Sequence, residues 1–157
     1  MINIRVYGIL INEKRQILVS DELIRGMKIT KFCGGGLEFG EGTVDCVIRE
    51  FKEEMNVAVK VKNHLYTTDF FQESAFNKEH QILSIYYEVE AENLNHVEFS
   101  NKPFEFSQSA LEKYKSTQQA ESFRLIDIEQ FTEECMSLPI DKIVASMIIE
   151  KEKNYQP

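Results

Sequence analysis

The sequence contains few of the residues that mark membrane-spanning, disulfide-linked or zinc-binding proteins. It has no tryptophan, three prolines and three cysteines among its 157 residues. The cysteines are odd in number and form no CxxC pair, so we expect reduced thiols. The three histidines are scattered, which argues against a histidine-based zinc site. No stretch approaches the ~20 apolar residues that a membrane helix needs, and the N-terminus lacks a signal-peptide pattern, so we expect a cytoplasmic protein.

Basic residues are also scarce relative to acidic ones. Lysine and arginine together number 18 against 26 aspartates and glutamates, which gives a formal net charge of −8. A surface this acidic repels the phosphates of nucleic acids and of anionic lipids. We therefore expect neither a nucleic-acid polymer nor a membrane as a partner. An acidic protein that handled a phosphorylated small molecule would need cations between the two.

Nothing in the sequence divides the chain into separate domains. It has no internal repeat or linker and its length suits one core, so we expect a single domain over residues 1–157. Alternating or β-branched runs predict strands at residues 2–11, 16–20, 28–33, 57–61 with an interrupted continuation to 71, 83–89 and 123–128. Helices are predicted at residues 43–55, near 109–115 and from Pro139 onward. This order of elements predicts an α/β (α+β) fold, with a layered α/β/α sandwich as the architecture.

The predicted helix at residues 43–55 carries both an apolar stripe and a cluster of carboxylates. The stripe has helical spacing and consists of Val44, Val47, Ile48, Phe51 and Met55. At ~100° per residue, Glu50, Glu53 and Glu54 fall in a sector about 100° wide beside that stripe. Anions gathered in this way repel one another. A hard divalent cation such as Mg²⁺ offsets the repulsion, prefers carboxylate oxygen, and brings substrate phosphate with it.

The ends of this helix have recognisable signals. Thr43 is predicted as the N-cap, and Asn56 as a left-handed residue that ends the helix. Residues 34–36 are three glycines, which we interpret as a turn that lets the backbone approach the carboxylates or a ligand. The alternative is an acidic, solvated helix face, which is common in proteins. The combination of glycines and carboxylates at fixed spacing favours the site.

The stretch from Gly35 to Val57 resembles the Nudix box, G-x5-E-x7-R-E-U-x-E-E-x-G-U, in which U is a bulky apolar residue. Every charged position of the pattern is present, at Glu41, Arg49, Glu50, Glu53 and Glu54. One position departs from it, because Asn56 replaces the second defined glycine. Asparagine tolerates a left-handed backbone better than most residues, so we expect the loop to be kept. The chain is therefore similar to the Nudix (MutT-like) hydrolases, with the box at residues 35–57.

The resemblance implies a mixed β-sheet sandwiched between helices, with the box as a loop-helix-loop segment and a helix at the C-terminus. It also implies that Mg²⁺, or Mn²⁺ in its place, is held by three carboxylates, those of Glu50, Glu53 and Glu54. Arg49 would pair with Glu41 or with a ligating glutamate and orient it. Gly35 and Gly36 would bring the backbone close to the metal and the phosphates.

The implied reaction is attack of water on phosphorus in a nucleoside diphosphate linked to X. Glu53 or Glu50 would act as the general base, and the sequence does not decide between them. The similarity to the family also allows a base on a distant loop, where the candidate acids are Glu105, Glu112 and Glu121. Homodimers are frequent among similar proteins, so the resemblance also implies a homodimer as a candidate assembly.

The substrate class is open at this stage. Signatures that follow the box in ADP-ribose, dinucleoside polyphosphate, coenzyme A and NADH hydrolases are absent, which leaves a nucleoside triphosphate or a nucleotide sugar. Phe70 and Phe71, and the segment 104–106, carry aromatic rings that could stack on a base. The alternative function is a catalytically silent Nudix domain that binds a nucleotide or metabolite as a sensor. The complete set of box acids argues against that alternative.

Overall fold

The structure, a computed structural model, describes residues 1–155, and its elements divide between two compact units. The first unit consists of Met1–Leu10 and Cys33–Val97. The second unit consists of Ile11–Phe32 and Glu98–Pro157, of which residues up to 155 are described. Each unit has its own sheet, so the strands form two sheets.

The first unit contains a four-stranded mixed sheet and one helix. The strands, in the order β4-β1-β6-β5, are β4 (Cys33–Gly36), β1 (Ile2–Leu10), β6 (Gln81–Ala91) and β5 (Val59–Thr67). β1 pairs in parallel with β6 and antiparallel with β4, and β5 pairs antiparallel with β6. Helix α1 (Thr43–Met55) packs on this sheet, where the ring of Phe51 lies against Gly8. A Cβ at Gly8 would lie 2.7 Å from that ring, so only glycine permits this approach.

The bounds of α1 agree with the predicted helix, and its caps differ in one respect. Gly42, and not Thr43, is the N-cap, and no side chain caps this end. Thr43 is the first helical residue, and its hydroxyl bonds the hydroxyl of Tyr87 at 2.6 Å. The left-handed conformation predicted for Asn56 is confirmed (φ 54°, ψ 39°), and its backbone N–H donates to the carbonyl of Lys52.

The buried side of α1 is rotated from the predicted apolar stripe. Val44 and Ile48 are 40% and 37% exposed, whereas Cys46 is fully buried together with Val47 and Phe51. At ~100° per residue, the centre of the buried side therefore moves toward the sector that carries Glu50 and Glu54. The carboxylates of Glu50 and Glu54 therefore belong to the packed side of the helix, whereas Glu53 is exposed.

The prediction that the three glycines form a turn is wrong, because they belong to strand β4. Gly34, Gly35 and Gly36 pair with Tyr7, Val6 and Arg5 of β1. A Cβ at Gly34, whose φ is +154°, would lie 2.0 Å from the carbonyl oxygen of Val6. Glycine is required here by the close approach of β1, and the loop begins only at Leu37.

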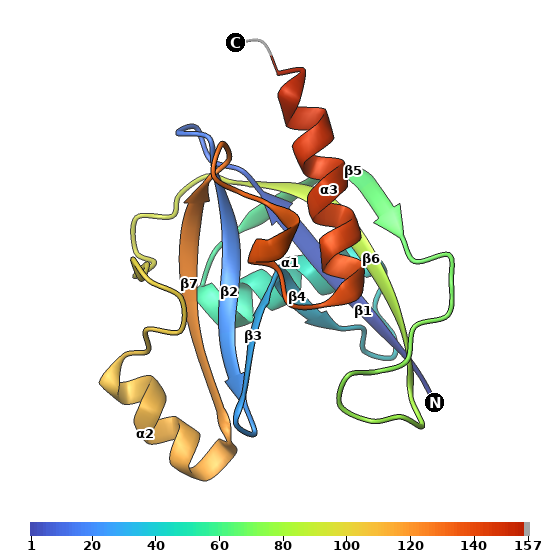
Figure 1. Cartoon of the computed structure of the whole chain (residues 1–157), viewed down its shortest axis with the longest axis vertical. Helices are drawn as coiled ribbons and strands as arrows, with labels where there is room; N and C mark the ends of the chain where they lie inside the picture. The colour runs from blue at the N-terminus through green and yellow to red at the C-terminus, as the bar shows by residue number, and fades with distance from the viewer. Residues whose placement is uncertain (156–157) are drawn as a thin grey trace. The chain divides into compact units, whose positions relative to one another are not determined.

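The second unit contains a three-stranded antiparallel sheet in the order β3-β2-β7. Its elements are β2 (Gln16–Ile24), β3 (Met27–Lys31), α2 (Gln108–Thr117), β7 (Gln119–Asp127), the 3₁₀ turn η1 (Glu133–Cys135) and α3 (Pro139–Lys153). Figure 1 shows α2 leading into one end of β7. The hydroxyl of Tyr114 on α2 accepts a hydrogen bond from the backbone N–H of Gly26, in the turn between β2 and β3.

Helix α3 begins at Pro139, as predicted, with the proline in its first turn. Ile140, Val144 and Ile148 are buried along it, whereas Ile143, predicted for the same apolar face, is 39% exposed. Within residues 1–155, no helix combines the length and the apolar character required to cross a bilayer. The single-domain assignment over residues 1–157 stays a prediction.

Candidate active site

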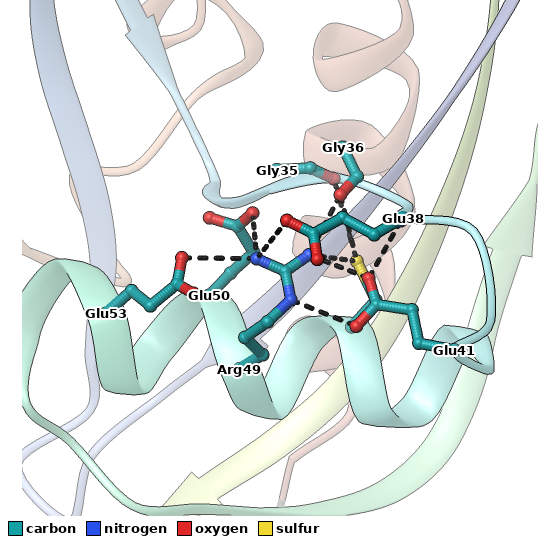
Figure 2. A network of polar contacts seen from close by, with 8 residues as sticks. Gly35, Gly36, Glu38, Glu41, Arg49, Glu50 and Glu53 are labelled. Carbon is teal, nitrogen blue, oxygen red and sulfur yellow. Dashed lines mark hydrogen bonds and ion pairs between the residues drawn. The ribbon is translucent and has the colours of Figure 1, made fainter.

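Arg49 lies at the centre of a cluster of four glutamates, which we call the arginine cluster: Glu38, Glu41, Arg49, Glu50 and Glu53 (Figure 2). Its Nε and Nη2 donate to the two carboxylate oxygens of Glu41 at 2.9 and 2.7 Å. Its Nη1 donates to Glu50 Oε1 at 3.0 Å and to Glu53 Oε2 at 3.1 Å. One guanidinium therefore connects the loop before α1 with two successive turns of the helix.

The loop before α1 supplies one residue that the sequence did not single out. Glu38 forms an ion pair with Arg49 at 3.7 Å, and its backbone N–H donates to Glu41 Oε1 at 2.9 Å. The box pattern allows any residue between Gly35 and Glu41, so it gives no signal for this contact. The bond from Glu38 holds the Glu41 carboxylate in the orientation that meets Arg49.

Gly35 and Glu50 are in direct contact. A Cβ at Gly35 would lie 2.4 Å from both the carboxyl carbon and Oε1 of Glu50. The Glu50 side chain is only 13% exposed, because it packs across this strand. The first glycine of the box therefore makes room for the Glu50 carboxylate, and the prediction of a backbone–carboxylate approach holds for Gly35.

Gly36 contributes through its carbonyl. Arg49 Nη2 donates to that oxygen at 3.0 Å, and the Cys46 thiol lies 3.5 Å from it. Burial, followed by the hydrogen bond with Glu41, raises the pKa of Cys46 to about 12. Cys46 is therefore a neutral thiol that donates to the backbone. Sequence reasoning missed this role, because a cysteine within an amphipathic helix looks like ordinary core.

The pair of Arg49 and Glu41 keeps its charges over a wide pH range. The hydrogen bonds from Arg49, and then the one from the Glu38 backbone, lower the pKa of Glu41 to about 2. The hydrogen bond with Glu41 also raises the pKa of Arg49. Glu41 and Arg49 therefore both remain ionised at neutral pH.

The donor set of this region fits a hard divalent cation. Within residues 1–155, no three acidic, histidine or cysteine side chains already stand in a metal-binding arrangement. Glu50 and Glu53 instead share one nitrogen of Arg49, and one carboxylate oxygen of Glu54 is buried beside them on α1. Mg²⁺ and Mn²⁺ prefer carboxylate oxygens as ligands, and α1 carries such oxygens on successive turns. Gly35 of β4 has no side chain, which leaves room for the Glu50 carboxylate.

Phe70 and Phe71 line a pocket of about 360 Å³ in the first unit. Its lining residues, which we call the aromatic pocket, are Thr68, Asp69, Phe70, Phe71, Gln81, Ile82 and Leu83. The pocket lies at the same end of the sheet as the loop of the box, because β6 and β1 begin there and β4 ends there. Phe70 and Phe71 are therefore beside a cavity, whereas the rings of the segment 104–106 do not line it. The polar residues that share the cavity were not predicted.

The three distant candidate bases differ in their surroundings. Glu105 and Glu112 are exposed, and Glu112 forms a surface ion pair with Lys115. Glu121, on β7 of the second unit, is largely buried, and its carboxylate accepts a hydrogen bond from the Ser20 hydroxyl at 2.7 Å. Burial raises the pKa of Glu121 to about 7, against the attraction of Lys31.

Comparisons with known proteins identify the family. Residues 1–134 match the model of the NUDIX domain. Similar solved structures include a Nudix hydrolase from Nitrosomonas europaea, at 14% identity and TM-score 0.65, covering 100% of this chain and 93% of that one. A MutT protein from Methanosarcina mazei Go1 has 16% identity and TM-score 0.61, with 98% and 96% covered. A UDP-X diphosphatase has 15% identity and TM-score 0.58, with 97% and 64% covered. No curated protein matches the chain.

The chain belongs to the Nudix family. It is accordingly a hydrolase of phosphorus-containing acid anhydrides, in a family that acts on small molecules and generally uses divalent metal ions. The similarity to the solved structures confirms the α/β fold class predicted from the sequence, with the box as loop-helix-loop and a helix near the C-terminus.

Proposed function

We propose that this chain is a cytoplasmic, Mg²⁺-dependent pyrophosphohydrolase that cleaves a diphosphate bond in a nucleoside diphosphate linked to X. A nucleoside triphosphate or a nucleotide sugar is the substrate class. The observation that carries the proposal is the arginine cluster, in which Arg49 gathers Glu41, Glu50 and Glu53 on one side of α1 against Gly35. Nucleoside triphosphates and nucleotide sugars both contain a diphosphate bond, and one similar structure is a UDP-X diphosphatase.

Each residue has a distinct role in this proposal. Three carboxylates hold the cation, those of Glu50, Glu53 and Glu54. Arg49 orients Glu50 and Glu53 through its Nη1 while Glu41 fixes the guanidinium from the other side. When bound, Mg²⁺ polarises a phosphoryl oxygen and lowers the pKa of a coordinated water.

Glu53 is our candidate for the general base. Its side chain is 59% exposed, whereas that of Glu50 is 13% exposed and packed on Gly35. A base must reach a water beside the substrate, and the more accessible carboxylate meets that condition better. Gly35 and Gly36 place the backbone beside this region, and Phe70 and Phe71 contact the part of the substrate that is not phosphate.

The test is a hydrolysis assay with matched variants. The protein is incubated with Mg²⁺ or Mn²⁺ and a panel of nucleoside triphosphates, nucleotide sugars, ADP-ribose and dinucleotides. The pyrophosphate or phosphomonoester that is released is converted by a coupling phosphatase to free phosphate, which is measured. We expect Glu53→Gln and Glu54→Gln to lose at least about 100-fold in kcat while the fold is retained. Glu90→Gln, which changes an exposed residue of an ion pair with Lys62, is the control and keeps its activity.

Two outcomes would contradict the proposal. Wild-type rates in both variants would remove the metal assignment. Binding of a nucleotide by the wild-type protein without turnover on any member of the panel would instead favour the silent sensor. Light scattering on the eluted protein tests the homodimer that we expect from the family.

A further inference from the structure

The aromatic pocket is held open by fixed backbone on both sides. Thr68 is bonded to Ser84 of β6 three times, through its backbone N–H at 2.9 Å and twice through its hydroxyl, at 3.0 and 2.9 Å. Beyond the pocket, the backbone N–H of Ile82 donates to the carbonyl of Gln72 at 2.8 Å. Residues 69–71 lie between these two attachments and stand away from β6. The pocket is therefore formed before any ligand arrives.

Aromatic rings are exposed at this pocket. Phe71 is 70% exposed and Phe70 is 41% exposed. Exposed rings beside a cavity mark a surface that is covered when a ligand binds. Their flat faces suit a planar ring in the ligand.

The polar groups of the pocket favour a neutral ligand with N–H donors. The Asp69 carboxylate accepts a hydrogen bond from the Tyr66 hydroxyl at 3.2 Å and keeps further acceptor capacity. Burial, and then Asp69 itself, raises the pKa of Tyr66, so that hydroxyl stays a donor. Gln81, which carries a side-chain amide, lines the same pocket. A carboxylate repels phosphate, so the phosphates of a nucleotide would lie outside this pocket.

A sugar fits these groups less well than a base. A pyranose carries a hydroxyl on nearly every carbon, and buried hydroxyls without partners are costly. A nucleobase has two apolar faces and one polar edge, which match two rings, one carboxylate and one amide. An exocyclic amino group beside a ring nitrogen would donate to Asp69 and pair with Gln81.

The pocket lies within reach of the arginine cluster. Leu83 pairs with Ile4 of β1, and the Ile4 carbonyl accepts a hydrogen bond from Leu37, the first residue of the loop before α1. Two strand spacings therefore separate the pocket from that loop, or about 10 Å. A ribose and its phosphates span a distance of this order.

We propose that the aromatic pocket binds the nucleobase of the substrate, stacked on Phe71 and Phe70, and that it selects bases with an exocyclic amino group through Asp69. The proposal rests on the proposed function only in treating the base as part of the hydrolysed nucleotide. It names the nucleoside, and not X, as the part of the substrate that is recognised here.

The absence of tryptophan allows a direct binding test. Phe71→Trp introduces the only tryptophan of the chain, and its fluorescence is followed while free nucleosides are added in EDTA. We expect a saturable change with guanosine, adenosine and cytidine, a weaker one with uridine, and none with glucose. Phe76→Trp, in the same loop and exposed but outside the pocket lining, is the matched control and shows no saturable change.

A second variant tests the polar edge. Asp69→Asn in the Phe71→Trp background should weaken binding of the amino-bearing nucleosides by about tenfold, because a charge-assisted hydrogen bond is lost. The measurement needs neither metal nor turnover, so it stands whether or not Glu53→Gln abolishes hydrolysis. No saturable response to any nucleoside, or an equal response to glucose, would overturn the inference.

Discussion

Two groups of carboxylates in this molecule contain a glutamate whose pKa is shifted, and the shifts have opposite directions. In the first unit, four glutamates surround Arg49, and the pKa of Glu41 is lowered to about 2. In the second unit, Glu22 and Glu121 lie opposite each other on β2 and β7 with Lys31 as their cation, and the pKa of Glu121 is raised to about 7. The group with more carboxylates per cation is therefore not the group that contains the glutamate of raised pKa.

The difference comes from the balance between direct hydrogen bonds and burial. Arg49 meets both oxygens of Glu41 with parallel bonds, and this contact outweighs the cost of desolvation. For Glu121 burial is the larger effect, and the attraction of Lys31 does not overcome it. The first group therefore keeps negative charge available to a cation, whereas the second reduces its charge and serves the packing of the sheet.

The opposite face of the second sheet carries a buried charge that is better satisfied by hydrogen bonds, and removing it should have a large effect on stability. Asp21 is fully buried and receives two hydrogen bonds from Arg124, at 2.5 and 3.0 Å, and one from Thr30 at 2.6 Å. We expect Asp21→Ala to lower the free energy of unfolding by about 3–5 kcal/mol, because it leaves Arg124 without its buried partner. Urea denaturation measures this loss.

The exposed Lys62–Glu90 pair provides the control for that experiment. Both side chains are 53% exposed, and Glu90→Ala should change the free energy of unfolding by about 0–1 kcal/mol. Equal effects for Asp21→Ala and Glu90→Ala would show that burial does not govern charge pairing in this protein.

The contacts of Arg49 in the first unit can be tested by a substitution that keeps its charge. Arg49→Lys keeps the charge but cannot bond Glu41 through two nitrogens while also reaching Glu50 and Glu53. We expect turnover and Mg²⁺ affinity to fall by about 10- to 100-fold, with little change in unfolding free energy. Hydrolysis rates and calorimetric Mg²⁺ titration measure the two effects, and Lys52→Arg, on the exposed side of the same helix, should leave both unchanged. An unaltered Mg²⁺ dependence in Arg49→Lys would show that the bidentate contact does not orient the carboxylates.

The smallest expected effect concerns pH. Because the folded pKa of Glu121 lies above its ordinary value of 4.5, the folded state binds this proton more tightly than the unfolded chain. The resulting stability is present below about pH 4.5 and is lost as the pH rises through about 7. Glu121→Gln carries no such proton, so we expect it to gain on the order of 1 kcal/mol relative to wild type between pH 5 and 8.

Unfolding curves of wild type and of Glu121→Gln, recorded at the two ends of this pH range, measure the difference in unfolding free energy. The comparison between the groups would fail if wild type and Glu121→Gln showed parallel pH dependence, since Glu121 would then titrate as an exposed acid does.

The parts of the molecule that depend on local pattern were predicted well. Helix α1 was found from its 3.6-residue periodicity, and the pairing of Arg49 with Glu41 was expected from the resemblance to the box. The left-handed Asn56 followed from its position after the helix. These features depend on residues close in sequence, so the sequence contains their signal.

The features that were missed depend on which segments meet in space. The three glycines form a strand because β1 approaches them, and no local pattern indicates that approach. The rotation of the buried side of α1 follows from the contact of Glu50 with Gly35 on another element. The polar residues of the aromatic pocket come from both sides of a loop, and neither Asp69 nor Gln81 stands out in the chain.

The place of β1 in its sheet has a consequence for how the protein is made. β1 lies between β4 and β6, and it pairs in parallel with β6 from Gln81 onward. During synthesis, β1 therefore lacks one neighbour until about 70 further residues have been made. At about 5–20 residues per second this delay lasts several seconds. During that time β1 has a free edge, where strands of other chains can pair.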